Sequence, residues 1–395
     1  MDRIHKIHSI ALTINMLYRS ILYLLFVVLV HSLPVCAQDT LMFKGQVSIW
    51  GNINPSNDLP VWLSGRAIPV FQFQTKLKKN RTIDFEGSAN IYGSIGSHPF
   101  DSVYSDGKIK PYRAWARYST SQLELRVGLQ KINFGQAVML RPLMWFDQLD
   151  PRDPLQITDG VWGMLGRYYF MNNANLWLWC LYGNEKVRTW EIGETIQKMP
   201  EFGGRFQMPV KKGEAAISYH FREADTSELQ GNVTTLSQVP ENWIGLDAKW
   251  DLGVGLWFEG TWINKGKPSG KLTNQEIMTT GIDYTFGMGN GLNVVYEQMV
   301  MAMNDKAFDF ADASVLSAMS VNYPLGLSDH LSSIVYYDWK NQNLYNFVNW
   351  KHQFKNYYLY LMAYSNPKYF NLPQQSGAGT LYSGKGFQIM LVYNY

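Results

Sequence analysis

Apolar and polar residues alternate with a period of two along most of the chain beyond residue 40. Successive side chains of a strand point to opposite faces, so alternation over about ten residues predicts a strand with one apolar and one polar face. Each instance is a weak signal, and repetition gives it weight. The eighteen segments lie near 42–51, 66–78, 81–92, 111–120, 122–131, 162–171, 174–182, 201–209, 213–222, 242–250, 254–264, 276–287, 291–302, 313–323, 330–339, 343–353, 356–365 and 385–395.

Tight and long connections alternate between these segments. The tight ones include Lys79–Asn80, Thr120–Ser121, Asn172–Asn173, Lys211–Lys212, Asp251–Gly253, Gly287–Asn290 and Lys355–Asn356. The long ones are 52–65, 93–110, 132–161, 183–200, 223–241, 265–275 and 366–384, and the short link 340–342 is an exception. Short periplasmic turns opposite long external loops are typical of outer-membrane barrels. We therefore predict an all-β fold, a transmembrane antiparallel β-barrel of about 18 strands, with 16 also possible, and with both termini in the periplasm.

The hairpin 112–131 shows the separation of the two faces. One face carries Tyr112, Ala114, Ala116, Tyr118, Leu123, Leu125, Val127 and Leu129. The other carries Arg113, Trp115, Arg117, Gln122, Glu124, Arg126 and Gln130. Apolar side chains on one face suit lipid, and charged side chains on the other suit a wet interior.

The two ends of the chain carry export signals. Residues 21–30 read ILYLLFVVLV, preceded by Arg19 and followed by Pro34 and Ala37. This order predicts a cleaved secretory signal peptide over 1–37, with Met16 as a possible start, before a barrel over 38–395. An uncleaved anchor would need a longer apolar run, and Cys36 after Val35 fits a lipoprotein signal badly. The last strand, 385–395, ends on an aromatic residue and resembles the C-terminal strand that outer-membrane barrels present to their assembly machinery. A terminal strand of a soluble β-sandwich would not need that aromatic end.

Composition narrows the functional classes. Residues 1–37 hold Arg3, Lys6 and Arg19 against Asp2, so the formal charge of +3 falls to +1 after cleavage. Nucleic-acid binding, which needs a strong basic excess, is not expected. Cys180 is the single cysteine after residue 37, so no internal disulfide is expected there. The sequence has no HExxH, GxSxG, paired CxxC or phosphate-binding glycine loop, and we expect no enzyme activity, no catalytic residue, no metal and no cofactor.

The long connection 132–161 follows a distinctive strand, Arg126-Val-Gly-Leu-Gln-Lys-Ile-Asn-Phe-Gly135. This R-x-G-x-Q-x-x-x-x-G pattern and the following loop, rich in Pro and Asp, resemble the alginate-export and related porin-like barrel families. The resemblance implies a long loop that folds into the lumen and narrows it. The candidate constriction residues are Arg141, Asp147, Asp150, Arg152, Asp153 and Asp159. The alternative is an external loop whose aspartates are solvated or bind Ca²⁺ adventitiously. Trp145 and Phe146 lie in the middle of this loop, where packing within the loop is favoured over a sugar-stacking platform.

Arginines are frequent on the predicted inner face of the first half of the barrel. The candidate pore-lining residues are Arg113, Arg117, Glu124, Arg126, Arg167, Arg205 and Arg222. The resemblance implies that such arginines guide anionic solutes. Acidic residues including Glu214, Asp247, Glu259 and Glu297 fall on the same face, however, and cross-strand pairing as wall support is the favoured interpretation.

Two functions remain after these steps. The first is an outer-membrane porin-like channel of a Gram-negative cell, for passive diffusion of small hydrophilic or anionic solutes, because a barrel of this size encloses an aqueous lumen unless it is plugged. The second is a non-conducting barrel that binds polysaccharide or a partner protein. The expected partners are outer-membrane lipid, lipopolysaccharide and small solutes, and the oligomeric state is left open.

Overall fold

The structure, a computed structural model, describes residues 40–98, 102–227, 236–368 and 382–395. The predicted signal peptide therefore lies outside the described residues. The strands are β1 (Thr40–Ile53), β2 (Val61–Leu77), β3 (Arg81–Ser97), β4 (Val103–Ser119), β5 (Leu123–Gln130), β6 (Val161–Tyr169), β7 (Asn175–Leu181), β8 (Glu194–Thr195), β9 (Glu201–Val210), β10 (Gly213–Asp225), β11 (Val239–Asp251), β12 (Gly255–Lys265), β13 (Asn274–Phe286), β14 (Leu292–Asn304), β15 (Ser314–Pro324), β16 (Asp329–Asp338), β17 (Asn343–Gln353), β18 (Tyr357–Ser365) and β19 (Lys385–Asn394), with a 3₁₀ turn, η1 (Gly270–Leu272).

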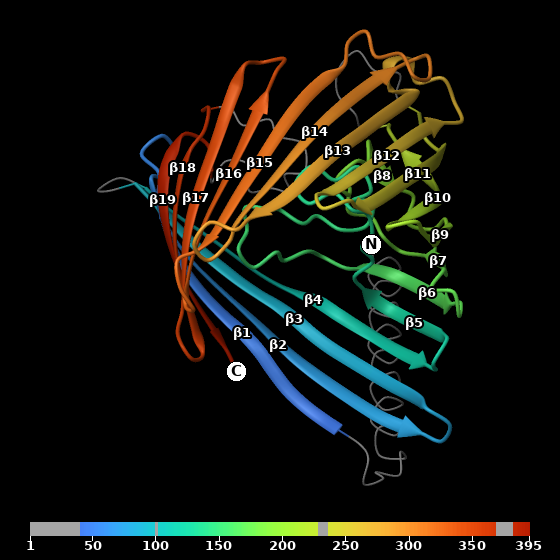
Figure 1. Ribbon diagram of the computed structural model, residues 1–395, viewed down its shortest axis with the longest axis horizontal. Coiled ribbons are helices and arrows are strands. Elements are labelled where there is room, and N and C mark those ends of the chain that lie inside the picture. Colours follow the sequence, from blue (N-terminus) through green and yellow to red (C-terminus); the bar gives the residue numbers. More distant parts are fainter. Residues whose placement is uncertain (1–39, 99–101, 228–235, 369–381) are drawn as a thin grey trace, which may run out of the picture.

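These strands form one closed antiparallel barrel (Figure 1). Each wall strand pairs with its neighbours in the chain, and β1 pairs with β19 from Gln46↔Asn394 to Ile53↔Phe387, which closes the sheet. The short β8 is not a wall strand, because it adds only Thr195 and Glu194 to the edge of β10 while β7 pairs directly with β9. Among the described residues, eighteen wall strands remain, and the predicted strand number is confirmed.

Short turns gather at one end of the barrel. Lys79, Asn80, Asn173 and Lys212 have φ between 53° and 64° in these turns, the left-handed conformation that tight hairpins need. Thr40 pairs with Gln74 beside the turn 78–80, and the backbone N–H of Tyr395 donates to the Gly45 carbonyl at 3.1 Å. The first and last described residues therefore lie at the short-turn end.

The connections expected at 52–65 and 93–110 are shorter than predicted. β2 pairs with β3 as far as Val61↔Ser97, and β3 pairs with β4 as far as Ser97↔Val103, beyond a register shift between Ser88 and Ala89. Backbone hydrogen bonds between neighbouring strands extend the ladder through these residues, since they do not depend on side-chain type.

The two faces of the wall separate as the alternation predicts. Arg117 lies opposite Arg126 on the inner face, and Ala116 lies opposite Val127 on the outer face. Val127 is 54% exposed. Other outward apolar residues around the barrel are between 41% and 58% exposed, including Ile49, Ile95, Leu178, Ile217, Leu246, Met319, Val348 and Ile389. An apolar outer belt on a closed barrel is stable in lipid, where no unpaired sheet edge is left. The chain is therefore a transmembrane β-barrel of the outer-membrane type.

Candidate functional site

The connection 131–160 lies inside the barrel and packs against its inner wall. Phe134, Trp145 and Phe146 are buried in one apolar cluster with inward residues of the wall, among them Trp243 of β11. The Trp145 and Trp243 rings meet edge to face, with centroids 5.7 Å apart, and the Trp145 indole N–H donates to Thr261 Oγ1 of β12 at 3.2 Å. Figure 1 shows this segment crossing the interior after β5. Trp145 and Phe146 thus pack the loop against the wall.

Two glutamates of the wall hold the backbone of this loop. Glu259 on β12 accepts the N–H groups of Gln136 and Ala137 on Oε2, at 2.7 and 2.8 Å, and that of Leu143 on Oε1 at 2.6 Å. Both its side chain and that of Glu297 are fully buried.

Glu297 on β14 repeats the arrangement on the neighbouring part of the loop. Its Oε1 accepts the N–H of Val138 at 2.6 Å, and its Oε2 accepts those of Met139 and Leu140 at 2.8 and 2.6 Å. The Trp257 indole N–H donates to the same carboxylate at 3.1 Å. A carboxylate that binds several N–H groups satisfies donors that would otherwise be buried without partners, which fixes the local path of the chain. Cross-strand pairing with arginines is the role expected of these glutamates from the sequence, but in the structure they bind loop backbone.

The charged residues of the loop mostly pair within it. Arg141 donates to Asp147 Oδ2 at 3.1 Å and to the Asn133 side chain at 3.0 Å. Burial raises the pKa of Asp147, and the Arg141 guanidinium opposes that rise. Arg152 binds Asp150 through two side-chain nitrogens, at 2.7 and 2.5 Å. These pairs shape the loop.

Asp153 and Asp159 secure the second half of the loop in different ways. Asp153 accepts the backbone N–H of Leu155 at 2.9 Å, and burial raises its pKa. Asp159 forms ion pairs with Lys110 of β4 and with Lys186, the latter at 2.7 Å. Asp159 therefore ties the loop to the wall and to the next connection.

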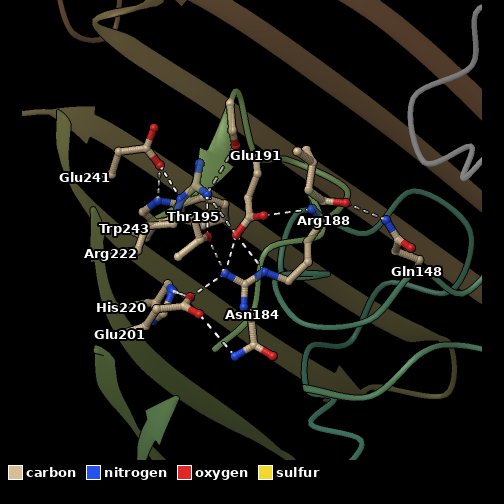
Figure 2. Close-up of polar contacts among 12 residues, drawn as sticks. Gln148, Asn184, Arg188, Glu191, Thr195, Glu201, His220, Arg222, Glu241 and Trp243 are labelled. Atoms are coloured by element: carbon tan, nitrogen blue, oxygen red, sulfur yellow. Dashed lines mark hydrogen bonds and ion pairs between the residues drawn. The ribbon is translucent and has the colours of Figure 1, made fainter. Parts of the chain in front are cut away.

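The connection 182–200 also turns inward, and it is held by a buried network of charges (Figure 2). Arg188 pairs with both Glu191 and Glu201, and Glu201 lies 3.2 Å from His220 Nε2. Arg222 pairs with Glu241 at 2.7 Å and donates to Thr195 Oγ1 at 2.9 Å. Burial lowers the pKa of Arg188, but its two carboxylate partners outweigh burial and raise that pKa above its usual value. The network joins the connection to β9, β10 and β11.

Three of the predicted pore-lining arginines are covered by the folded loops. Arg205 forms a two-bond pair with Asp247, at 2.5 and 2.9 Å, and Arg222 belongs to the network of Figure 2. Arg113 points to the base of the long loop, where it donates to the Thr158 carbonyl at 3.0 Å. All three side chains are buried.

The other predicted lining residues come together on β4, β5 and β6. Glu124 lies within 3.0 Å of Arg126, 3.5 Å of Arg167 and 3.7 Å of Arg117, so three guanidinium groups meet one carboxylate. Asp84 of β3 accepts a second bond from Arg117 at 3.0 Å. The Arg126 and Arg167 guanidinium groups stack on Trp115 and Trp177, at 4.7 and 3.8 Å from the ring centroids. We call Arg117, Glu124, Arg126 and Arg167 the arginine cluster.

The arginine cluster keeps contact with solvent, unlike the covered arginines. The side chain of Arg117 is 29% exposed and those of Arg126 and Arg167 are 14% and 16% exposed, whereas that of Arg222 is 0% exposed. The inward faces of β12 to β17 are covered by the loop 131–160 in the same apolar cluster as Trp145. The arginine cluster on β4, β5 and β6 therefore borders a wetted part of the interior.

The R-x-G-x-Q-x-x-x-x-G pattern has a structural basis. Gly128 has a φ of +119°, and a Cβ there would lie 2.1 Å from the Ala114 carbonyl oxygen. Gly135 has a φ of +103°, and a Cβ there would lie 2.5 Å from Glu259 Oε2. The buried Gln130 side chain donates to the Gly163 carbonyl at 3.0 Å. The pattern therefore specifies how the chain leaves β5 and enters the barrel, and it was the one sequence signal available for the Glu259 contact.

The described part of the chain contains no group of three or more His, Cys, Asp or Glu side chains placed to hold a metal ion.

No helix within the described ranges has the length and apolar character needed to cross a membrane.

Comparison with known proteins returned structural similarities alone. No protein-family model and no curated protein matches the sequence. Among solved structures, an anion-selective porin from Comamonas acidovorans is 12% identical, with 90% of this chain and 100% of that chain covered and a TM-score of 0.46. Salmonella typhi OmpF, in complex with daunomycin, is 12% identical over 91% of this chain and 98% of that chain, with a TM-score of 0.48. A mutant porin of Rh. blastica is 11% identical over 90% of this chain and 100% of that chain, with a TM-score of 0.43.

The residues of the chain combine a closed eighteen-stranded wall, an apolar outer belt and a long connection folded into the interior. Within the described residues, the protein is therefore a transmembrane β-barrel whose interior is partly filled by its own loop.

Proposed function

We propose that this protein is a passive channel for small hydrophilic solutes and that it favours anions. The observation that carries the proposal is the arginine cluster, in which three guanidinium groups outnumber the two carboxylates paired with them, Glu124 and Asp84, and retain solvent exposure. Fixed charges on a pore wall act on permeating ions, and an excess of one sign selects the opposite sign. The cluster therefore favours anions.

The folded loop gives the channel its narrowest part in this proposal. The connection 131–160 packs against the inner wall from β12 to β17 and leaves the arginine cluster in contact with solvent. Arg141, Asp147, Asp150, Arg152, Asp153 and Asp159 act as supports that hold the constriction in place, since their charges are largely compensated by neighbours.

The position of the short turns suggests how the barrel is oriented in the membrane. We propose that the short-turn end, with both termini, lies in the periplasm, as in outer-membrane barrels in general. Residues 1–37 direct export, and the strand β19, which ends beside the aromatic Tyr395, is recognised during barrel assembly. Lipid and lipopolysaccharide contact the outer belt.

Conductance in planar bilayers tests the proposal. The purified mature barrel should insert as discrete conductance steps, and in a KCl gradient its reversal potential should have the sign of an anion-selective pore. The control is a preparation unfolded by boiling in detergent. A barrel shown by circular dichroism to be folded, yet without steps at any voltage, would contradict the channel function and favour a binding barrel.

A further inference from the structure

Val138 differs from the other apolar residues of the loop. Every other apolar residue between Ile132 and Asp147 is buried, whereas Val138 as a residue is 52% exposed. Surface exposure inside a closed barrel means that free space adjoins the side chain. A loop that merely packs against the wall gains nothing from leaving one valine uncovered, because burial of apolar surface is favourable.

The backbone at Val138 is fixed on both sides. The preceding residue, Ala137, donates its N–H to Glu259, while Val138 and the following Met139 donate theirs to Glu297. Both glutamates are buried on the inner wall, so the Val138 backbone faces the wall at this point. The exposed side chain must then point away from the wall, into the unfilled part of the interior.

Valine has properties that suit a constriction at this position. Its branched Cβ leaves few side-chain conformations, so on a fixed backbone it presents a surface of constant size. An apolar surface in a narrow wet passage also raises the cost of keeping water there, which makes such a point a barrier to ions and polar solutes.

We propose that Val138 is the residue that sets the size limit of the channel, with Glu259 and Glu297 as positioning residues that hold it. The inference rests on the proposed channel function, and it adds the specific side chain that a permeating solute must pass.

Cysteine labelling during conductance measurement tests this. Val138→Cys is made with Cys36 and Cys180 replaced by alanine, and a charged methanethiosulfonate reagent is added to the open channel. The added group should lower single-channel conductance at least about twofold, since it narrows the passage itself. Leu327→Cys is the matched control, because Leu327 is fully exposed in the short turn 325–328 and its labelling should leave the conductance unchanged.

Side-chain size gives a second readout on the same channels. Val138→Gly should raise, and Val138→Trp should lower, the size of polyethylene glycol that still enters the pore. Conductance that stays constant after complete labelling of Val138→Cys, confirmed by mass spectrometry, would overturn the role of Val138 while leaving the channel function intact. Failure of the cysteine to react would overturn it as well. Absence of conductance in the parent barrel would instead contradict the proposed function.

Discussion

The Glu297 carboxylate on β14 accepts a hydrogen bond from the backbone N–H of Leu140 at 2.6 Å, although the two residues are 157 positions apart. This bond belongs to a set in which Glu259 and Glu297 each bind three backbone N–H groups of the same loop. Two wall residues thus determine the path of the segment that enters the barrel.

Replacing Glu297 by glutamine should release the loop without unfolding the barrel. Glutamine keeps the shape of the side chain but offers one carbonyl oxygen in place of two carboxylate oxygens. Some buried N–H donors of the loop therefore lose their acceptor, and each unsatisfied donor costs about 1–3 kcal/mol. We expect faster hydrogen exchange over residues 136–143 and noisier, larger conductance steps.

The matched control for Glu297→Gln is Glu86→Gln. Glu86 is also an inward carboxylate, on β3, but it binds the Gln72 side chain at 2.7 Å. Its replacement should leave exchange over 136–143 unchanged. Equal exchange in Glu297→Gln and the wild type would show that the loop is held by its apolar contacts alone.

Gly135→Ala should displace the loop through a steric contact. The new Cβ would lie 2.5 Å from Glu259 Oε2, in addition to the strain of a positive φ, which costs a residue with a Cβ about 1–2 kcal/mol. Gly183→Ala separates the two effects, because Gly183 has a φ of +78° with no heavy atom within 4 Å of its Cβ position. Protease sensitivity of the loop should rise much more for Gly135→Ala than for Gly183→Ala. Equal sensitivity would point to backbone strain alone.

The Arg205–Asp247 pair should behave as a buried ion pair. Removing one partner leaves an uncompensated buried charge, so Arg205→Met and Asp247→Leu alone should each lower the free energy of unfolding by about 3–5 kcal/mol. The double substitution should lower the free energy of unfolding much less, because neither charge is then left buried without its partner. Urea unfolding in detergent micelles measures the free energy of unfolding of the wild type, the two single variants and the double variant, which together form a double-mutant cycle. Additive losses would show that the two side chains act independently.

Docking of the second half of the loop should depend on pH through Asp159. Burial raises the pKa of Asp159, but hydrogen bonds from Lys110 and Lys186 outweigh burial and hold that pKa below its usual value. A carboxyl with a lowered folded pKa contributes stability above its unfolded pKa of about 3.9, and the contribution is lost as pH falls through the folded pKa.

Asp159→Asn should therefore loosen residues 150–160 at neutral pH and have no effect at a pH below the folded pKa. The Asp159 ion pairs should contribute about 1 kcal/mol or less to the stability of the docked loop, since both lysines are partly exposed. Hydrogen exchange at the two pH values measures it, with Asp312→Asn, which alters an exposed pair with Lys271, as the control. A difference that persists at low pH would exclude the ionised carboxylate as the cause.

Ion selectivity should follow the arginine cluster. Replacing Arg126 and Arg167 by glutamine removes two of the positive charges around Glu124, so the reversal potential in a KCl gradient should shift toward cations, most clearly in dilute salt where screening is weak. Lys271→Gln removes one exposed positive charge and should not shift it. An unchanged potential in the arginine variant would place selectivity elsewhere.

The sequence by itself determined the wall of the barrel. Each of the eighteen wall strands overlaps a segment that the alternation predicts, although β2, β3 and β4 extend beyond theirs, and Arg117 and Arg126 share the inner face as expected. The period of two is a local property of the chain, since each side chain points opposite to its neighbour. Such local patterns can be recognised without knowledge of distant residues. The glycines of the R-x-G-x-Q-x-x-x-x-G strand are a local sequence feature of the same kind.

Only the tertiary structure decided which inward residues stay exposed to solvent and which are buried in contacts with the loops and the wall. Arg126 and Arg205 look alike in sequence, yet one remains wetted and the other is buried in a pair with Asp247. Likewise nothing near Glu259 or Glu297 in the chain reveals that their partners are backbone N–H groups more than a hundred residues away. These contacts arise when a closed wall brings distant strands around one loop, and the alternation that predicts each strand carries no information about what fills the space between them.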